Sequence, residues 1–365
     1  MIVMKNILFS LLTIFLSFSA NAADTVWHDA SEFPLYGKIS DKTNFRYERL
    51  PGYLEEIARK PVWELGRNSA GLYLRFCSDS PFISVKWTPM FDNTMSHMAD
   101  TGTKGVDLYM LTDEGWSFVR CWRLKAGKKE QEETISCDPV MRDYMLYLPL
   151  YDGVKSLEIG VKEGSYIGMP EKQSPKTDKP VIMYGSSILQ GGCCSRPGMA
   201  HTNILARRID RTVINLGFSG NAKIDYEIAE LMASYHDPGL FVLDYAPNCN
   251  AQLIDEKAEN FFRIIRDAHP DVPVVFVALP PYPRKTFSTK MANSMVDINA
   301  AQLRVYQKLK KAGEKNIYYV KSEGMLGNDN EATVDGTHFT DLGMVRYVDH
   351  ILPTIKKALR SAKVK

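Results

Sequence analysis

The spacing of apolar residues changes character part-way along the chain. Between residues 27 and 161, apolar and polar positions alternate in short runs that are rich in β-branched and aromatic residues. A period of two is typical of β-strands with one buried and one partly wet face. The clearest runs are residues 71–76, 82–87, 116–120 and 156–161. Short strands at this spacing predict an antiparallel β-sandwich or jelly roll.

From residue 181 onward, strand and helix patterns alternate. Continuous apolar runs are interleaved with stretches whose apolar residues recur every three or four positions. The predicted strands are residues 181–184, 212–216, 240–246, 272–279 and 317–320, and the predicted helices are residues 203–210, 224–235, 251–268, 299–311 and 342–359. This alternation predicts a parallel sheet with helices on both faces, whose ligands bind beyond the carboxyl ends of the strands.

A polar segment that contains Pro170, Pro175 and Pro180 separates the two patterns. It shows no apolar period, and polar stretches with Pro are typical of interdomain linkers. We therefore predict a β-sandwich domain at residues 23–165, a linker at 166–180 and an α/β domain at 181–365.

Residues 1–22 have the layout of a secretory signal peptide. Lys5 precedes an apolar run at residues 7–18, and Ala20 and Ala22 supply the small residues that a cut after Ala22 requires. The apolar run is short for a membrane span, and an uncleaved N-terminal anchor is the alternative. No Cys precedes Cys77, so no lipid-modified Cys stands at the cut. We expect a secreted or periplasmic protein with no stable membrane span after cleavage.

Composition narrows the classes of function. The 365 residues include 45 Lys and Arg against 43 Asp and Glu, and hydrophobic residues make up 45%. This balance excludes a wholly disordered chain, and without a basic block it gives no sign of a nucleic-acid partner. The five Trp all lie in the first third of the chain, where they either fill the sandwich core or contact sugars: Trp27, Trp63, Trp87, Trp116 and Trp122.

Six Cys are too few for a disulfide scaffold in a chain of this length. Cys121 and Cys137 could close a hairpin through a disulfide. No C-x-x-C motif and no His/Cys cluster with zinc spacing occurs, so we predict no structural metal and no cofactor.

The ends of the predicted parallel strands carry candidate chemistry. Ser187 follows the first strand in a turn flanked by Gly185 and Gly191, where a serine hydroxyl can be exposed at the sheet edge. Gly220 follows the second strand and Asn248 the third, and both can donate N–H groups to an oxyanion. The alternatives are an ordinary Gly/Ser turn, a loop glycine and a turn-capping Asn.

The C-terminal end supplies a base and a carboxylate. Of the seven His, His338 alone has a carboxylate three residues upstream, which is Asp335. The pair lies between the last predicted strand and the last predicted helix, where an α/β enzyme places its base. A structural His is the alternative interpretation.

At this point the sequence resembles the SGNH hydrolase family, also called the GDSL esterase/lipase family. The resemblance covers about residues 180–360, and the family pattern falls on five residues: Ser187, Gly220, Asn248, Asp335 and His338. Upstream, the motif Gly-Val-Asp-Leu-Tyr at residues 105–109 resembles a subgroup with an N-terminal β-domain. There are two departures: Ser186 replaces the usual Asp, and residues 246–249 replace the usual Gly-x-Asn-Asp.

The resemblance implies a flavodoxin-like three-layer hydrolase domain with a Ser187–His338–Asp335 triad. The backbone N–H groups of Ser187 and Gly220 and the amide of Asn248 would form the oxyanion hole. It also implies short-chain esters, with acetylated carbohydrates as the natural class. The alternatives are a non-catalytic carbohydrate-binding protein, or a thioesterase, lysophospholipase or peptidase on the same fold. The loop at residues 90–105 either reaches over the site or is an ordinary sandwich loop.

Overall fold

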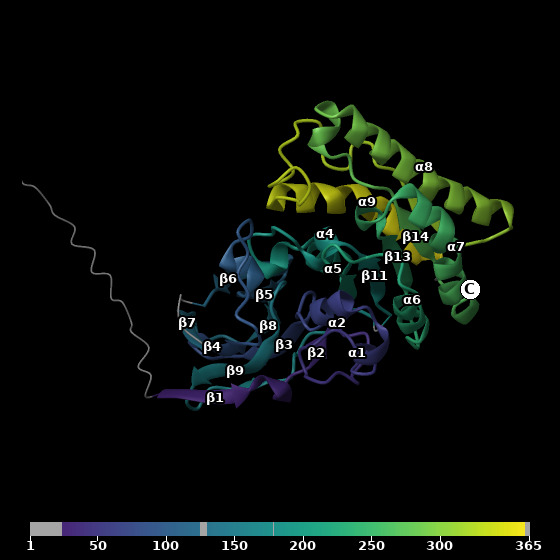
Figure 1. The fold of residues 1–365 in the computed structure, drawn as a ribbon. Coiled ribbons are helices and arrows are strands. Elements are labelled where there is room, and N and C mark those ends of the chain that lie inside the picture. Colours follow the sequence, from purple (N-terminus) through teal and green to yellow (C-terminus); the bar gives the residue numbers. More distant parts are fainter. Residues whose placement is uncertain (1–23, 125–129, 178, 362–365) are drawn as a thin grey trace, which may run out of the picture.

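The computed structural model describes residues 24–124, 130–177 and 179–361. The predicted signal peptide therefore lies outside the described residues. We call residues 24–177 the N-terminal region and residues 179–361 the C-terminal region. The two regions lie side by side, with α8 (Thr289–Lys311) at the end of the molecule farthest from the N-terminal sheets (Figure 1).

The N-terminal region contains two antiparallel sheets, in the orders β1-β9-β4-β7 and β10-β3-β8-β5-β6, with β2 paired to β3. The strands are β1 (Thr25–Asp29), β2 (Leu35–Tyr36), β3 (Tyr73–Ser78), β4 (Phe82–Pro89), β5 (Val106–Thr112), β6 (Gly115–Trp122), β7 (Gln131–Ser136), β8 (Arg142–Tyr147), β9 (Val154–Lys162) and β10 (Ile167–Gly168). Side chains from both sheets share one buried cluster that includes Val85, Trp87, Trp122 and Leu146. The predicted β-sandwich is confirmed, and Trp87 and Trp122 serve to fill its core.

The C-terminal region is built on a five-stranded parallel sheet in the order β12-β11-β13-β14-β15. Its strands are β11 (Val181–Gly185), β12 (Val213–Gly217), β13 (Leu240–Asp244), β14 (Val274–Val277) and β15 (Ile317–Val320). Every residue of β11, β12, β13 and β14 is buried, as expected for a sheet covered on both faces. This order is the flavodoxin-like order that the family resemblance implied.

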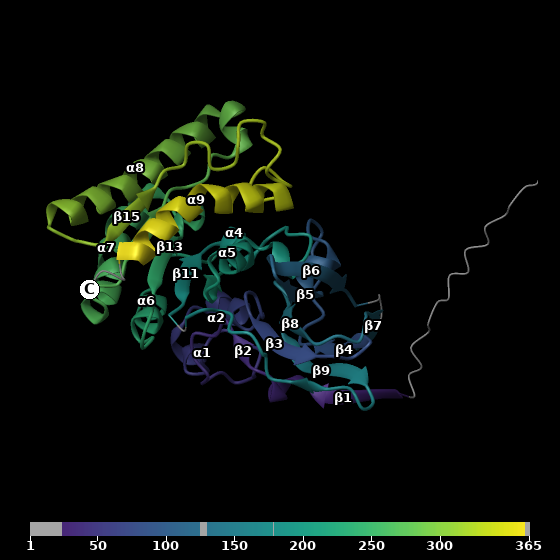
Figure 2. The same ribbon diagram turned by 180° about the vertical axis from the view of Figure 1, so that it is seen from behind.

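Helices cover both faces of this sheet (Figure 2). The longer ones are α5 (His201–Ile209), α6 (Tyr226–Ala233), α7 (Ala251–Ala268), α8 and α9 (Asp341–Ser361). Helix α5 packs with α9, whereas α7 packs with both α6 and α8. Helix α8 begins ten residues before the predicted start at 299, because Ser288 caps it by accepting a hydrogen bond from the N–H of Met291. In the described part of the chain, no helix is long and apolar enough to span a bilayer.

One expectation for the N-terminal region needs correction, and two short helices there were not predicted. Cys121 lies on β6 and Cys137 follows β7, and these strands belong to different sheets, so the two Cys do not close a hairpin and both are free. The short helices α1 (Leu54–Ile57) and α2 (Lys60–Gly66) do not join the sandwich core. Their buried residues, among them Leu54 and Trp63, belong to the core cluster of the parallel sheet. The division into domains at residues 166–180 remains our proposal.

A buried arginine joins the two regions. Arg49 is 1% exposed, and its guanidinium donates to the carbonyl oxygens of Leu65 and Asn68 in the N-terminal region. The same guanidinium donates to the carbonyl oxygens of Asn215 and Gly217, at 3.0 and 2.9 Å, at the carboxyl end of β12. Burial lowers the pKa of Arg49 to about 9, which leaves it charged at neutral pH. The end of β12 is therefore held in place by the N-terminal region.

We predict that Arg49→Met lowers the free energy of unfolding by about 3 kcal/mol or more, because it leaves buried carbonyl groups without a donor. Urea denaturation followed by tryptophan fluorescence measures this effect. Arg46→Met is the matched control, because Arg46 is exposed and donates to Phe33 within the N-terminal region. An Arg49→Met protein as stable as the Arg46→Met protein would contradict the role assigned to this contact.

Candidate active site

Ser187 stands in a sharp turn between β11 and the short helix α4 (Ser187–Gln190). Ser186 caps this helix, and its hydroxyl accepts a hydrogen bond from the N–H of Ile188 at 3.2 Å. A Cβ at Gly185 would lie 2.6 Å from the carbonyl oxygen of Asp244, so the turn requires glycine there. Because serine caps helices about as well as aspartate does, Ser186 can perform the capping role at a position where the family usually has Asp.

His338 connects Ser187 to Asp335 through hydrogen bonds. Its Nε2 lies 2.9 Å from the hydroxyl oxygen of Ser187, and its Nδ1 lies 2.7 Å from Oδ2 of Asp335. The backbone N–H of His338 donates to Oδ1 of the same carboxylate at 2.8 Å. Three residues from the two ends of the C-terminal region therefore form one hydrogen-bonded chain at the carboxyl edge of the parallel sheet.

The carboxylate of Asp335 is ionised throughout the neutral range. Partial burial alone would raise its pKa, but hydrogen bonds from the side chain and backbone of His338 and from the backbone of Thr337 outweigh burial. Together they lower the pKa of Asp335 to about 2. An ionised carboxylate beside Nδ1 holds the imidazole with its proton on Nδ1, so that Nε2 faces Ser187 as an acceptor.

Gly220 and Asn248 lie on the loops that follow β12 and β13. Gly220 has a φ of +68°, a left-handed conformation that glycine adopts without strain. Hydrogen bonds hold the two neighbours of Gly220 in place. The N–H of Ser219 donates to Oε1 of Gln190, and the N–H of Asn221 donates to the carbonyl of Phe218. Among the described residues, the N–H group of Gly220 has no hydrogen-bond acceptor. It is a donor held in a fixed loop.

The orientation of the Asn248 amide is also set. Its Oδ1 accepts a hydrogen bond from the N–H of Ala222 at 3.1 Å, on the loop that carries Gly220. The amide nitrogen Nδ2 therefore remains as the side-chain donor. Asn248 does not cap a helix. Asn250 has that role, because its Oδ1 accepts from the N–H of Leu253 at the start of α7.

Both regions line a cavity of about 650 Å³. Ser187, Asp335 and His338 are not among its lining residues, and Tyr151 connects it to the serine turn. The N-terminal region contributes residues of α2, Asn68, Tyr151 and the part of the 90–105 loop that includes Phe91 and Asn93. The C-terminal region contributes Ser219 and Asn221, the two neighbours of Gly220. The hydroxyl of Tyr151 donates to the carbonyl oxygen of Ser187 at 3.2 Å. The 90–105 loop is therefore part of the wall of this cavity.

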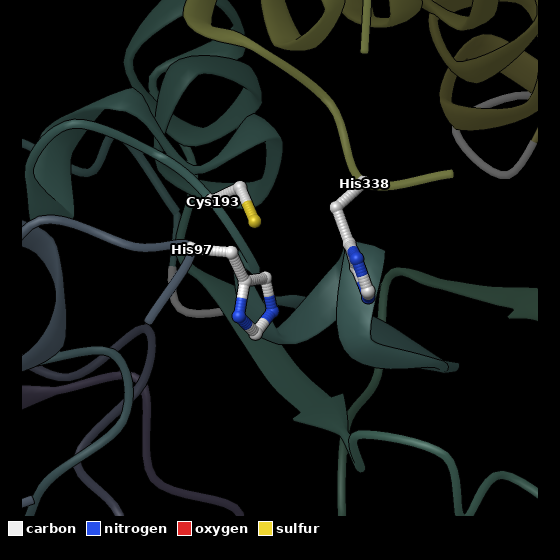
Figure 3. Close-up of side chains that lie close together, drawn as sticks. All are labelled: His97, Cys193 and His338. Carbon is white, nitrogen blue, oxygen red and sulfur yellow. The ribbon is translucent and has the colours of Figure 1, made fainter. Parts of the chain in front are cut away.

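Two residues that were not among the predicted site residues lie beside His338. His97, on the 90–105 loop, has its ring centroid 5.6 Å from that of His338. Cys193 is buried next to both (Figure 3). Burial, together with the nearby charge of Asp335, raises the pKa of the Cys193 thiol to about 12, so this Cys is not an activated nucleophile. No local motif marks either residue, because the contact depends on how the two regions pack.

Comparison with known proteins shows the family to which the chain belongs. The family model of the GDSL-like lipase/acylhydrolase family matches residues 178–356, and the model for the N-terminus of SGNH-hydrolase-type esterases matches residues 25–167. A GDSL-like protein from Bacteroides ovatus is 34% identical, with a TM-score of 0.87 over 92% of this chain and 98% of its own. The chain belongs to the GDSL-like lipase/acylhydrolase family. It is thus a carboxylic ester hydrolase by family, with the N-terminal region typical of one of its subgroups.

Solved structures of lower sequence identity share the fold. A salicylyl-acyltransferase from a tetracycline biosynthetic pathway is 17% identical, with a TM-score of 0.75 over 91% of this chain and 97% of its own. An acetyl xylan esterase from the rumen bacterium Butyrivibrio proteoclasticus is 12% identical, with a TM-score of 0.54 over 92% and 100%. A family two carbohydrate esterase from Cellvibrio japonicus has 12% identity and a TM-score of 0.57 over 92% and 98%. No curated protein matches the chain.

Proposed function

We propose that this protein is an exported serine esterase that hydrolyses short-chain esters, chiefly acetyl esters, on carbohydrates. The observation that carries the proposal is the hydrogen-bonded chain from Asp335 through His338 to Ser187. A serine hydroxyl is a weak nucleophile until a neighbouring base takes its proton, and this geometry supports such a transfer. Export rests on the signal-peptide pattern of residues 1–22.

The reaction proceeds in two halves. His338 Nε2 takes the proton of Ser187 as the serine oxygen attacks the ester carbonyl, while ionised Asp335 stabilises the resulting imidazolium. His338 then gives the proton to the leaving alcohol, and an acyl-enzyme remains on Ser187. Water attacks the acyl group with His338 again as base, which releases the carboxylic acid and restores the serine.

Negative charge on the carbonyl oxygen is met by donors fixed before the substrate arrives. These are the N–H groups of Ser187, at the start of α4, and Gly220, together with Nδ2 of Asn248. The start of a helix leaves its first N–H groups without intrahelical partners, which favours an anion there. Donors that need no reorganisation stabilise the transition state more than the ground state.

The cavity supports a carbohydrate as the alcohol part of the ester. Its wall includes the side chains of Asn93 and Asn221 and the exposed ring of Phe91. The charged side chains of Glu64 and Arg67 line it as well, and Arg67 lies over the ring of Phe91. Amides can bond sugar hydroxyls, and an aromatic face can stack on a sugar ring. Apolar side chains, among them Leu65 and Met95, line the cavity as well. Relatives with this fold that are named as carbohydrate esterases also support the proposal.

The alternative of a non-catalytic carbohydrate-binding protein is weaker. A binding protein has no need for a base at 2.9 Å from a serine hydroxyl or for a carboxylate at 2.7 Å behind that base. The Trp residues also give it little support, because the residues lining the cavity include no Trp and Trp87 and Trp122 are buried in the sandwich.

We predict that Ser187→Ala lowers kcat for p-nitrophenyl acetate by about 10⁴-fold or more. Asn248→Ala removes one donor and lowers kcat by about 10²–10³-fold. Asn250→Ala is the matched control, because it removes a helix cap worth about 1 kcal/mol of stability but no donor to the oxyanion. Steady-state kinetics on the three variants tests the assignment, and undiminished turnover by Ser187→Ala would refute it.

A second prediction concerns the sugar. Phe91→Ala is expected to raise KM for acetylated xylo-oligosaccharides roughly three- to tenfold through lost stacking, and to leave KM for p-nitrophenyl acetate unchanged. Acetate release measures both. Tyr166→Ala, which removes an exposed aromatic ring outside the cavity, is the control. Equal effects of Phe91→Ala on both substrates would argue against a sugar in this cavity.

A further inference from the structure

Three potential metal ligands converge at the mouth of the site. One nitrogen each of His97 and His338 and the sulfur of Cys193 all lie within 4.8 Å of one another (Figure 3). They come from three separate segments: the 90–105 loop, the turn after α4 and the loop before α9. Imidazole nitrogen and thiolate sulfur are the donors that zinc prefers.

We propose that His97, Cys193 and His338 bind Zn²⁺, and that the bound ion reversibly inhibits the esterase. Inhibition, though not binding, rests on the proposed role of His338 as the base. The ligand atom of His338 is Nε2, because Asp335 occupies Nδ1 at 2.7 Å. Carboxylate–histidine pairs of this kind orient many zinc ligands. Zinc on Nε2 takes away the electron pair that would accept the proton of Ser187.

The distances require only a small movement. With Zn–N bonds of about 2.0–2.1 Å and Zn–S bonds of about 2.3 Å, two ligands of one tetrahedral ion lie about 3.3–3.8 Å apart. The imidazole of His97 is exposed, so a rotation of its side chain can bring its nitrogen from within 4.8 Å of the other two ligand atoms to this separation. Coordination releases the thiol proton of Cys193 to solvent, so that the ion gains a thiolate. Three protein ligands leave a fourth position for water.

The segment that carries His97 is fixed on both sides. Before it, the N–H groups of Phe91 and Asn93 donate to the buried carboxylate of Asp152 at 2.9 and 2.7 Å. After it, the hydroxyl of Thr101 donates to the carbonyl oxygen of Ser195 at 2.5 Å, beyond Cys193. His97 is therefore presented to the other two ligands by an anchored loop, which reduces the entropy that binding must overcome.

Cys193 itself has an unusual backbone. Its φ of +68° lies in the left-handed region, which is costly for a residue with a side chain. Backbone strain of this kind is often kept where a side chain must point in a particular direction. Here the side chain is buried and faces the two imidazoles (Figure 3).

Binding is tested first without catalysis. Ser187→Ala retains all three ligands, so Co²⁺ titrated into this variant is expected to give a thiolate-to-cobalt absorption band that Zn²⁺ displaces. Adding Cys193→Ser should abolish the band, and adding His97→Ala should weaken cobalt affinity at least about tenfold. Cys137→Ser and His28→Ala alter a Cys and a His remote from the cluster. They should leave the absorption band and the cobalt affinity unchanged. Absence of the band in Ser187→Ala would overturn the zinc site whether or not the protein is an esterase.

Inhibition is tested with the wild-type protein. Zn²⁺ is expected to lower p-nitrophenyl acetate hydrolysis, and EDTA is expected to restore it. With each variant compared to its own rate without metal, His97→Ala and Cys193→Ser should need at least about tenfold more zinc for half inhibition. Equal zinc sensitivity in wild type and both variants would overturn the inhibitory role. A cobalt band in a protein without esterase activity would instead contradict the proposed function and still support the zinc site.

Discussion

The buried guanidinium of Arg49 is the contact on which the geometry of the site depends most. A charge removed from water must find partners, and in the described part of the chain no carboxylate forms an ion pair with Arg49. It is satisfied by backbone carbonyl groups of both regions, including those of Asn215 and Gly217. These carbonyls end β12, just before the loop that carries Gly220. Arg59 adds to the restraint by donating to the carbonyl of Asn221 at 2.6 Å and to the carboxylate of Asp225. The conformation of the loop that carries Gly220 is thus coupled to the N-terminal region.

This coupling changes what the N-terminal region contributes. The groups proposed for chemistry all lie in the C-terminal region, which has no Trp. The N-terminal region nevertheless supplies Tyr151, which bonds the carbonyl of Ser187, and much of the cavity wall. It also brings His97 next to His338. The cavity is therefore formed by the two regions together, and the N-terminal region also contacts the serine turn.

Local patterns in the sequence predict much of this protein, and their limits have a physical cause. Ser187, Gly220 and Asn248 could be proposed as parts of one site because parallel strands end at a common edge, so residues far apart in sequence meet there. His338 could be paired with Asp335 because the two lie on one tight loop. The contacts of Tyr151 and His97 could not be predicted, because they arise where two regions pack and leave no periodic signal. For the same reason, the positions of α1 and α2 could not be predicted. Their apolar residues pack into the core of the C-terminal region.

The central claim is that Ser187 is the nucleophile activated by His338. Its most direct test is labelling with a fluorophosphonate, followed by peptide mapping by mass spectrometry. The account predicts one label per molecule, on Ser187, and a much slower reaction in His338→Ala, whose serine lacks its base. Labelling of a different serine, or no labelling of the folded protein at all, would contradict it.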